Sequence, residues 1–247
     1  GSIAPYLNAR VLLDWDGDGN DDVLLAHATS NLWYVMRSTG ETLASGVSTG
    51  LPFVGAAAVT DLNGDHQPDL GYRDGSGVWR YRTREVAHTY PDLLSVATDG
   101  FGVAATFAYQ PISNSAIYTR GTGTVFPDVD LEAPLWVVSA LTTTDGTGYG
   151  STYSLQFSYE GARRNTQGRG FLGFAKRTVV DGRLGYNLRT LESYRQDFPY
   201  IGALQSLERQ KANGARISLT TLTWQNLMAG AGYEVRRYPY VASSTTD

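Results

Sequence analysis

The sequence contains no cysteine, little positive charge and no long apolar run. Without cysteine there is no disulfide framework and no thiolate metal site. Acidic residues outnumber basic ones, and the net charge of −4 gives no electrostatic basis for nucleic-acid binding. No apolar run approaches the roughly 20 residues that a membrane helix needs. We therefore expect no membrane span and no nucleic-acid partner.

Glycine and tyrosine are abundant, with 28 and 16 residues respectively. Turns joined by aromatic strands produce this pairing, and helical periodicity is weak throughout the chain. Only Ala203–Lys211 fits a helix or a strand equally well. A chain of 247 residues can form one large β domain or two smaller ones. We predict an all-β fold.

The chain begins Gly1-Ser2 without an initiator methionine and without a visible signal peptide. We interpret it as a piece of a longer protein, so that a targeting signal would lie outside it. Absence of cysteine is compatible with export but does not establish it.

Residues 1–83 contain an internal repeat built on an acidic loop. The loop Asp14–Asp22, DWDGDGNDD, recurs 47 residues later as Asp61–Asp69, DLNGDHQPD. A period of this length with several short strands per unit is typical of propeller blades. The strand-like runs after the loops are Val23–His27, Leu32–Arg37, Leu70–Arg73 and Val78–Arg82. About one and a half units are present, and a closed propeller needs at least about four blades. We predict partial β-propeller-type repeats.

The two acidic loops offer the hard oxygen ligands that calcium prefers. The predicted ligands are Asp14, Asp16, Asp18, Asn20 and Asp22 in the first loop, and Asp61, Asn63, Asp65, Gln67 and Asp69 in the second. Glycine occupies the sharp turn of the first loop, whereas His66 stands at that position in the second. The alternative is a solvated acidic turn, but carboxylates packed this closely repel one another unless a cation is present.

An EF-hand would need a bidentate glutamate at the twelfth loop position. Leu25 and Tyr72 occupy that position, and strand-like sequence follows each loop. The loops instead resemble the calcium loops of FG-GAP/VCBS (integrin-type) propeller repeats, which end at the ninth-position aspartate and continue into a strand. We interpret the metal as structural, because no base or nucleophile stands nearby in the sequence.

Residues 84–247 lack this repeat and read as a series of longer strands. In Thr152–Tyr159, apolar residues occupy every second position, which is the period of a strand. The predicted strands are Leu94–Thr98, Val103–Tyr109, Ala116–Arg120, Leu135–Thr143, Thr152–Tyr159, Phe171–Val180, Tyr186–Arg195, Leu204–Lys211, Ala215–Trp224 and Tyr233–Tyr238. Hairpin turns are predicted at Asp99-Gly100, Asp145-Gly146, Asp181-Gly182 and Asn213-Gly214. We predict an antiparallel, strand-rich region.

Three motifs suggest other chemistry. Gly46–Gly50 matches a nucleophile elbow but lacks the following helix, and only three histidines exist as partners. Gly146–Gly150 resembles a phosphate loop without the closing Lys-Ser/Thr. A basic stretch with interleaved phenylalanines would suit RNA, although strand faces explain it better. Its members are Arg163, Arg164, Arg169, Lys176, Arg177 and Arg183. We predict no catalytic residues.

The second region carries phrases that resemble known families. Leu93–Gly102, followed by Thr106–Tyr109, looks like a phrase of Rhs (YD-repeat) shells in which an Asp-Gly-x-Gly turn is followed by T-x-x-Y. Gln167–Phe174, Asp181 and Tyr194–Pro199 together resemble the segment between the propeller and the Rhs repeats in B-type components of insecticidal toxin complexes and in SpvB-like proteins. Those proteins carry FG-GAP repeats just upstream, which is the order found here.

The resemblance implies a secreted shell whose propeller docks to a pore-forming partner and whose Rhs strands enclose a toxic payload. This sequence departs from the pattern: the propeller is truncated, the YD signature is sparse and the autoproteolytic Rhs core is missing. Payload enclosure and cleavage are therefore not assigned to it.

We thus expect a non-enzymatic structural and interaction segment, secreted or at the cell surface, with residues 1–83 and 84–247 as its two domains. Its partners would be toxin-complex subunits or the remainder of its own chain. The alternative is a calcium-dependent adhesin or carbohydrate-binding module that binds a surface receptor or glycan. An extracytoplasmic hydrolase is the third hypothesis.

Overall fold

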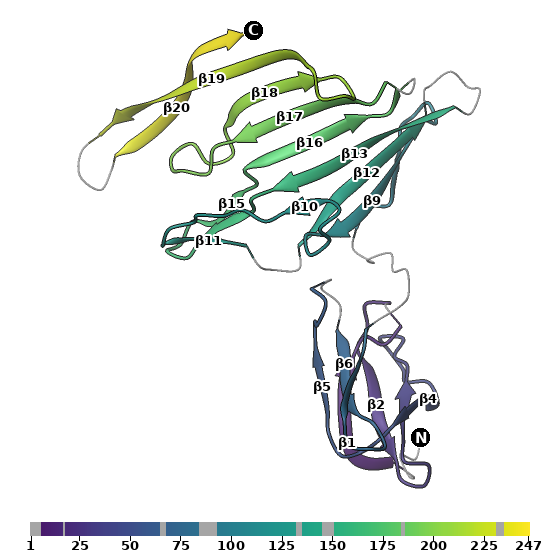
Figure 1. The fold of residues 1–247 in the computed structure, drawn as a ribbon. Helices are drawn as coiled ribbons and strands as arrows, with labels where there is room; N and C mark the ends of the chain where they lie inside the picture. The colour runs from purple at the N-terminus through teal and green to yellow at the C-terminus, as the bar shows by residue number, and fades with distance from the viewer. Residues whose placement is uncertain are drawn as a thin grey trace. The chain divides into compact units, whose positions relative to one another are not determined.

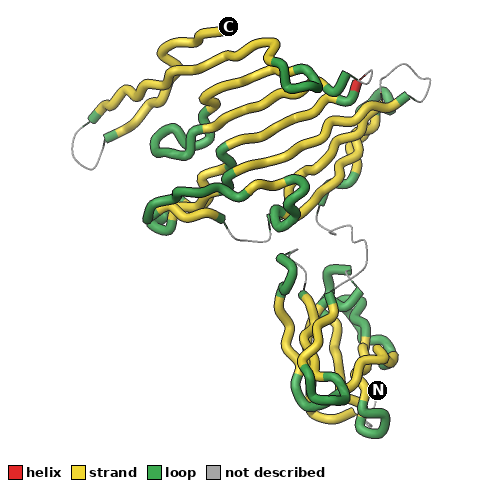
Figure 2. The backbone as a smooth tube through the Cα atoms, viewed as in Figure 1, coloured by secondary structure: helices red, strands yellow, loops and turns green. Residues whose placement is uncertain are grey.

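The computed structural model describes residues 6–16, 18–64, 68–83, 93–131, 135–144, 151–183, 186–230 and 235–247, without the side chains of 7–9. Every named element is a β-strand, and strands make up nearly all of the regular structure in Figure 2, which confirms the all-β prediction. Contacts divide the chain into two compact units, residues 1–94 and 95–247. The predicted boundary after residue 83 lies close to this division, and residues 84–92 lie outside the described part.

The first unit begins with a four-stranded antiparallel sheet in chain order (Figure 1). Its strands are β1 (Tyr6–Leu13), β2 (Asp22–His27), β3 (Leu32–Met36) and β4 (Val47–Pro52). In β3, Trp33 and Val35 are buried and their neighbours are more exposed. This alternation follows from the two-residue period of a strand, which places one side of β3 against the core.

A three-stranded antiparallel sheet follows in the same unit. It consists of β5 (Ala57–Thr60), β6 (Asp69–Arg73) and β7 (Trp79–Arg82). One acidic loop joins β1 to β2 and the other joins β5 to β6, so the internal repeat of the sequence is present in the strand order. Neither sheet closes on itself among the described strands, and the structure shows no closed propeller.

One apolar core serves both sheets of this unit. Leu70 of β6 is almost fully buried in the cluster formed by the first sheet. The other buried members are Leu13, Leu24, Ala26, Trp33 and Val35. Phe53 packs edge-on against Trp33, with ring centroids 5.0 Å apart. The second repeat is therefore held to the first by shared apolar burial.

The second unit contains one large sheet in the order β20-β19-β18-β17-β16-β13-β12-β9-β8. All neighbours on this path are antiparallel, and β10 pairs with β13 in parallel. The strands are β8 (Val96–Thr98), β9 (Ala104–Pro111), β10 (Tyr118–Thr119), β12 (Trp136–Thr144), β13 (Thr152–Glu160), β16 (Lys176–Asp181), β17 (Leu188–Tyr194), β18 (Leu204–Gln210), β19 (Arg216–Ala229) and β20 (Arg236–Thr246). The ambiguous stretch Ala203–Lys211 is thus a strand.

A small antiparallel sheet, β11-β14-β15, branches from the large one. Its strands are β11 (Asp128–Asp130), β14 (Arg163–Asn165) and β15 (Gly170–Gly173). The prediction of one continuous strand over Phe171–Val180 is wrong, because Gly173 has a φ of +85° and the chain turns there before β16 begins.

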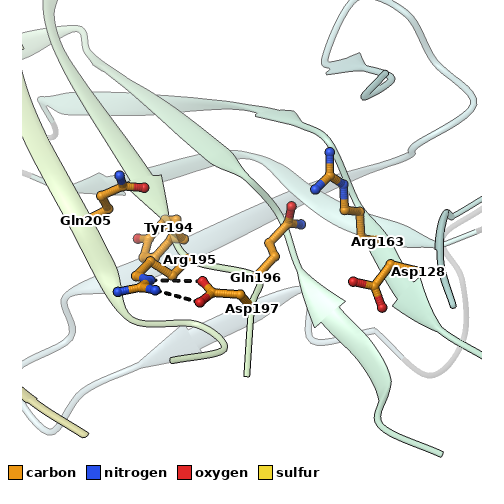
Figure 3. Close-up of a pocket in the computed structure, with 7 residues that line it drawn as sticks. All are labelled: Asp128, Arg163, Tyr194, Arg195, Gln196, Asp197 and Gln205. Atoms are coloured by element: carbon orange, nitrogen blue, oxygen red, sulfur yellow. Dashed lines mark hydrogen bonds and ion pairs between the residues drawn. The ribbon is translucent and has the colours of Figure 1, made fainter. Parts of the chain in front are cut away.

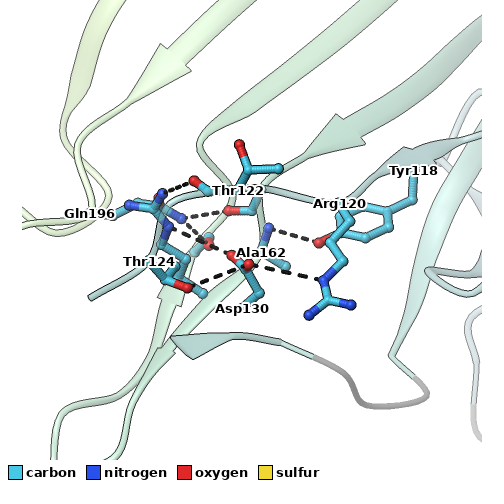
Figure 4. Close-up of polar contacts among 10 residues, drawn as sticks. Tyr118, Arg120, Thr122, Thr124, Asp130, Ala162 and Gln196 are labelled. Carbon is cyan, nitrogen blue, oxygen red and sulfur yellow. Dashed lines mark hydrogen bonds and ion pairs between the residues drawn. The ribbon is translucent and has the colours of Figure 1, made fainter. Parts of the chain in front are cut away.

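The small sheet joins the large one at a polar junction (Figure 4). The buried Tyr118 hydroxyl accepts a 3.0 Å hydrogen bond from the Ala162 amide. The Gln196 side-chain amide donates two bonds of 2.7 Å, to the carbonyls of Gly161 and Gly173. Tyr118 and Ala162 also belong to the apolar core of this unit, with Ile112 and Val137. Side chains therefore tie together segments that are distant in the sequence.

Beyond this junction the large sheet is open to solvent. Among the described residues, no hydrophobic side chain from β16 to β20 is fully buried. All eleven residues of β20 are exposed. The apolar burial of the unit is concentrated near β9, β10, β12 and the small sheet.

Candidate functional site

The first acidic loop brings three of its five predicted ligands together. One carboxylate oxygen from each of Asp14, Asp16 and Asp18 lies within 4.8 Å of the other two. The Asp16 Oδ1 atom is buried without a hydrogen-bond partner. The loop folds back on itself, because the Gly19 amide donates to Asp14 and the Asn20 amide to Asp18. The result is a group of converging hard oxygens of the kind that binds calcium.

Asp22 is the first residue of β2 and does not belong to this group. It is fully buried, and its two carboxylate oxygens accept bonds from the Trp15 amide at 2.9 Å and the Ser38 amide at 2.7 Å. Burial raises the pKa of this carboxyl above its usual value, against the lowering effect of the two amides. Asp22 therefore fastens the two ends of the loop to the start of the hairpin.

The second loop repeats this arrangement in part. Asp69 is fully buried and accepts a 2.8 Å bond from the Leu62 amide, which is the same seven-residue spacing as in the first loop. Asp61 accepts a 2.7 Å bond from the Gly64 amide, and Asn63 lies in the same turn. The predicted ligands Asp65 and Gln67, and His66 between them, lie outside the described residues.

One charged neighbour of the first loop was not predicted from the sequence. The Arg37 Nε atom lies 3.4 Å from Asp16 Oδ2. Arg37 directly follows β3, and the pairing of Val23 with Met36 brings it beside the loop. The contact between Arg37 and Asp16 could not be predicted from the local sequence, because it depends on the β2–β3 register. The arginine offsets part of the negative charge of the three aspartates.

A polar pocket of about 390 Å³ lies in the second unit (Figure 3). Its lining residues are Asp128, Arg163, Tyr194, Arg195, Gln196, Asp197 and Gln205. Arg195 and Asp197 form a two-pronged ion pair at 2.9 and 2.5 Å, which lowers the pKa of the Asp197 carboxyl. The Asp128 carboxylate accepts a 2.6 Å hydrogen bond from the side-chain amide of Asn165. Arg195 and Asp197 neutralise each other and Asp128 is held by Asn165, so these groups of the pocket have structural contacts within the fold.

The other sequence motifs take structural positions. Ser48, in the elbow-like motif, lies in β4 and pairs with Tyr34 of β3. Gly146–Gly150 lies outside the described residues. Four members of the basic stretch face carboxylates, namely Arg163 with Asp130, Lys176 with Glu160, Arg177 with Glu192, and Arg183 with Asp181. Most of the basic stretch is therefore neutralised within the fold.

Comparison with protein families identifies the chain. The family model described as "Insecticide toxin TcdB middle/N-terminal region" matches residues 38–184. This match covers more than half of the chain, which therefore belongs to that family. A search of the curated proteins found no match.

Two solved structures share the fold. "Crystal Structure of TcdB2-TccC3 without hypervariable C-terminal region" is 17% identical and "Structure of Photorhabdus luminescens Tc holotoxin pore, Mutation TccC3-D651A" is 16% identical. Each has a TM-score of 0.69 and covers 96% of this chain. The chain spans only 14% of the length of either. Within the described residues, no helix has the length and apolar character needed to cross a membrane.

Proposed function

We propose that this chain is a non-enzymatic structural and interaction segment of a secreted toxin-complex protein. The observation that carries the proposal is the family match over residues 38–184. The fold similarity to toxin-complex structures, over nearly the whole chain, supports it. So does the site chemistry, because charged groups of the polar pocket are engaged within the fold: Arg195 with Asp197, and Asp128 with the Asn165 side chain.

In this proposal the two sheets of the first unit are successive blades of a propeller-type array. Two features support this: a four-stranded antiparallel sheet in chain order, and a second sheet that repeats its loop position. The shared core around Leu70 is the kind of contact through which neighbouring repeats stabilise each other. Protein partners would be other toxin-complex subunits or the rest of the same chain.

A chimera tests the structural role. Residues 6–247 would replace the corresponding segment of TcdB2, and the product would be co-expressed with TccC3. We expect the two proteins to co-purify as they do with unmodified TcdB2, because a structural segment is exchangeable when its fold is kept. An unrelated β domain of equal length is the control. Co-purification that is lost equally in both chimeras would contradict the proposal.

We also propose that calcium binds the first acidic loop through Asp14, Asp16 and Asp18. The fit rests on the three converging oxygens and on the buried, unpartnered Asp16 Oδ1. The cation would relieve the mutual repulsion of the carboxylates and hold the β1–β2 connection in one conformation. Asn20 is close enough in sequence to add a ligand, while Asp22 acts through the backbone amides.

Chelation tests the calcium proposal. Removing calcium should lower the melting temperature, and Asp18→Ala should remove most of that sensitivity. Asp21→Ala is the matched control, because Asp21 is an exposed aspartate of the same loop outside the converging group. Differential scanning fluorimetry with and without chelator measures both. An unchanged melt in chelator would refute calcium binding.

A further inference from the structure

Two arginines lie against one exposed phenylalanine in the second unit. The Arg169 guanidinium carbon is 4.1 Å from the centroid of the Phe198 ring, and that of Arg237 is 5.5 Å away. Phe198 remains 51% exposed. Each residue comes from a different part of the chain: the β14–β15 turn, the β17–β18 loop and β20, which meet at one end of the large sheet (Figure 1). We call these three residues the Arg169–Phe198–Arg237 cluster.

The two arginines of the cluster have no carboxylate partner among the described residues. In this they differ from Arg195, which is paired with Asp197, the residue directly before Phe198. Arg237 instead donates to the Met228 sulfur at 3.3 Å, and Met228 is itself 60% exposed. A chain with a net charge of −4 thus gathers two unneutralised cations around exposed apolar side chains.

The position of Phe198 is fixed before any partner arrives. The β17–β18 loop is closed by backbone bonds from Arg195 to Ala203 and from Tyr200 to Asp197, at 2.9 and 2.8 Å. Arg195 also stacks on the Tyr200 ring at 3.8 Å. A preorganised loop reduces the entropy lost on binding.

We propose that the Arg169–Phe198–Arg237 cluster is a docking surface for an acidic peptide segment of a protein partner. A guanidinium that stacks on a ring leaves N–H groups at its edge for a carboxylate, which binds them with hydrogen bonds in the guanidinium plane. A nucleobase would have to displace Arg169 in order to stack on Phe198. Arginine, aromatic residues and methionine are also enriched in the cores of protein interfaces.

This inference depends on the proposed function only in that a structural segment of an assembly contacts other protein. The surface is independent of the acidic loop, which belongs to the other unit. A peptide assay with the isolated chain therefore fails or succeeds separately from calcium binding and from the TcdB2 chimera.

Fluorescence anisotropy with three labelled probes tests the proposal. The probes are an octapeptide of alternating Glu and Leu, the same peptide with Gln for Glu, and an eight-residue uridine oligonucleotide. We expect the acidic peptide to bind at least about tenfold more tightly than the glutamine peptide, because two guanidinium–carboxylate contacts are lost. Binding should weaken as salt is raised.

Variants locate the binding to the cluster. Arg169→Gln and Arg237→Gln should each weaken acidic-peptide binding by at least about fivefold. Arg169→Lys should weaken it by at least about threefold, because lysine keeps the charge but loses the planar two-bond contact. Arg209→Gln, at an exposed arginine of β18 without a described carboxylate partner, is the matched control and should stay within about twofold.

Three outcomes would overturn the proposal. One is the absence of measurable binding by the acidic peptide. Another is an equal loss of binding in Arg209→Gln and in the cluster variants, which would indicate general charge attraction. The third is tighter binding of the oligonucleotide through the same arginines, which would make the surface a nucleic-acid site. Circular dichroism spectra that match the unmodified chain ensure that each variant is folded.

Discussion

At the scale of single residues, Asp22 shows how a carboxylate in a metal-like motif can act through backbone amides. Both of its oxygens are occupied by amides of Trp15 and Ser38. In the second loop, Asp69 accepts a hydrogen bond from the Leu62 amide, which corresponds to the bond from Trp15 to Asp22. The aspartate at the ninth position of each loop therefore acts as a latch: its carboxylate binds a backbone amide at the start of the loop and holds the loop to the following strand.

Removing the Asp22 carboxylate should be strongly destabilising. Asp22→Ala leaves two amides without their acceptor, and an unpaired buried polar group costs about 1–3 kcal/mol. We expect the free energy of unfolding of residues 1–94 to fall by about 2–4 kcal/mol in urea denaturation. The exposed Asp21→Ala should change it by less than about 0.5 kcal/mol. Equal effects of the two substitutions would contradict the latch.

Gly161 lies where the small sheet leaves the large one, with a φ of +63°. An added Cβ would stand 2.9 Å from Ala175 Cβ, closer than packed atoms allow. Gly161→Ala should therefore combine backbone strain with overpacking and cost about 2–4 kcal/mol. Gly170→Ala is the matched control, since Gly170 has a φ of +68° with open space around it. It should cost only about 1 kcal/mol in the same urea titration.

The sequence indicated where the acidic residues of the first unit would gather, but not how their roles divide. The spacing of Asp14, Asp16 and Asp18 is local, so the loop pattern predicts their convergence. The contacts of Asp22 with Ser38, and of Asp16 with Arg37, depend on the β2–β3 register. Long-range pairing of this kind has no signature in a nine-residue motif.

At the scale of elements, the β16–β17 pair carries a cross-strand ion pair on an otherwise open sheet. Arg177 Nε donates to Glu192 Oε2 at 2.6 Å, and the Tyr194 hydroxyl donates to the same oxygen at 2.9 Å. Burial raises the pKa of the Glu192 carboxyl, but the two hydrogen bonds outweigh it and hold the pKa below its ordinary value of 4.5.

Stability should therefore depend on pH through Glu192. Because its folded-state pKa is depressed, its contribution is present above pH 4.5 and is lost as pH falls through the folded-state pKa. Glu192→Gln should lower the free energy of unfolding by about 1–3 kcal/mol at neutral pH, and by less in acid. Glu160→Gln is the control, because its pair with Lys176 is exposed and is worth at most about 1 kcal/mol. Urea titrations at several pH values measure both.

Strand positions in the second unit were largely predictable, whereas the small sheet was not. Thr152–Tyr159 alternates clearly and forms most of β13. The Asp99 and Asn213 turns also lie where predicted, between β8 and β9 and between β18 and β19. The strands β11 and β14 have three residues each, too few for a period to emerge. Their pairing is specified by the junction around Tyr118 and Ala162.

At the scale of the whole molecule, each unit has its own apolar core. Calorimetry of the full chain should therefore show two transitions, and residues 95–247 expressed alone should reproduce one of them. We expect a chelator to shift only the transition of residues 1–94, because the acidic loops lie there. A single transition that is lost when either unit is removed would contradict this.

Strand order also bears on how the second unit folds. Most neighbours in its large sheet are consecutive in the chain, so their pairing closes short loops. Two pairings, β9 with β12 and β13 with β16, join strands that are separated in the chain by other strands. The first pairing encloses β10 and β11, and the second encloses β14 and β15, so each must close a longer loop. We expect the hairpins to form early and the junction late. Ala162 or Tyr118 substitutions should then accelerate unfolding in stopped-flow experiments while leaving the refolding rate nearly unchanged.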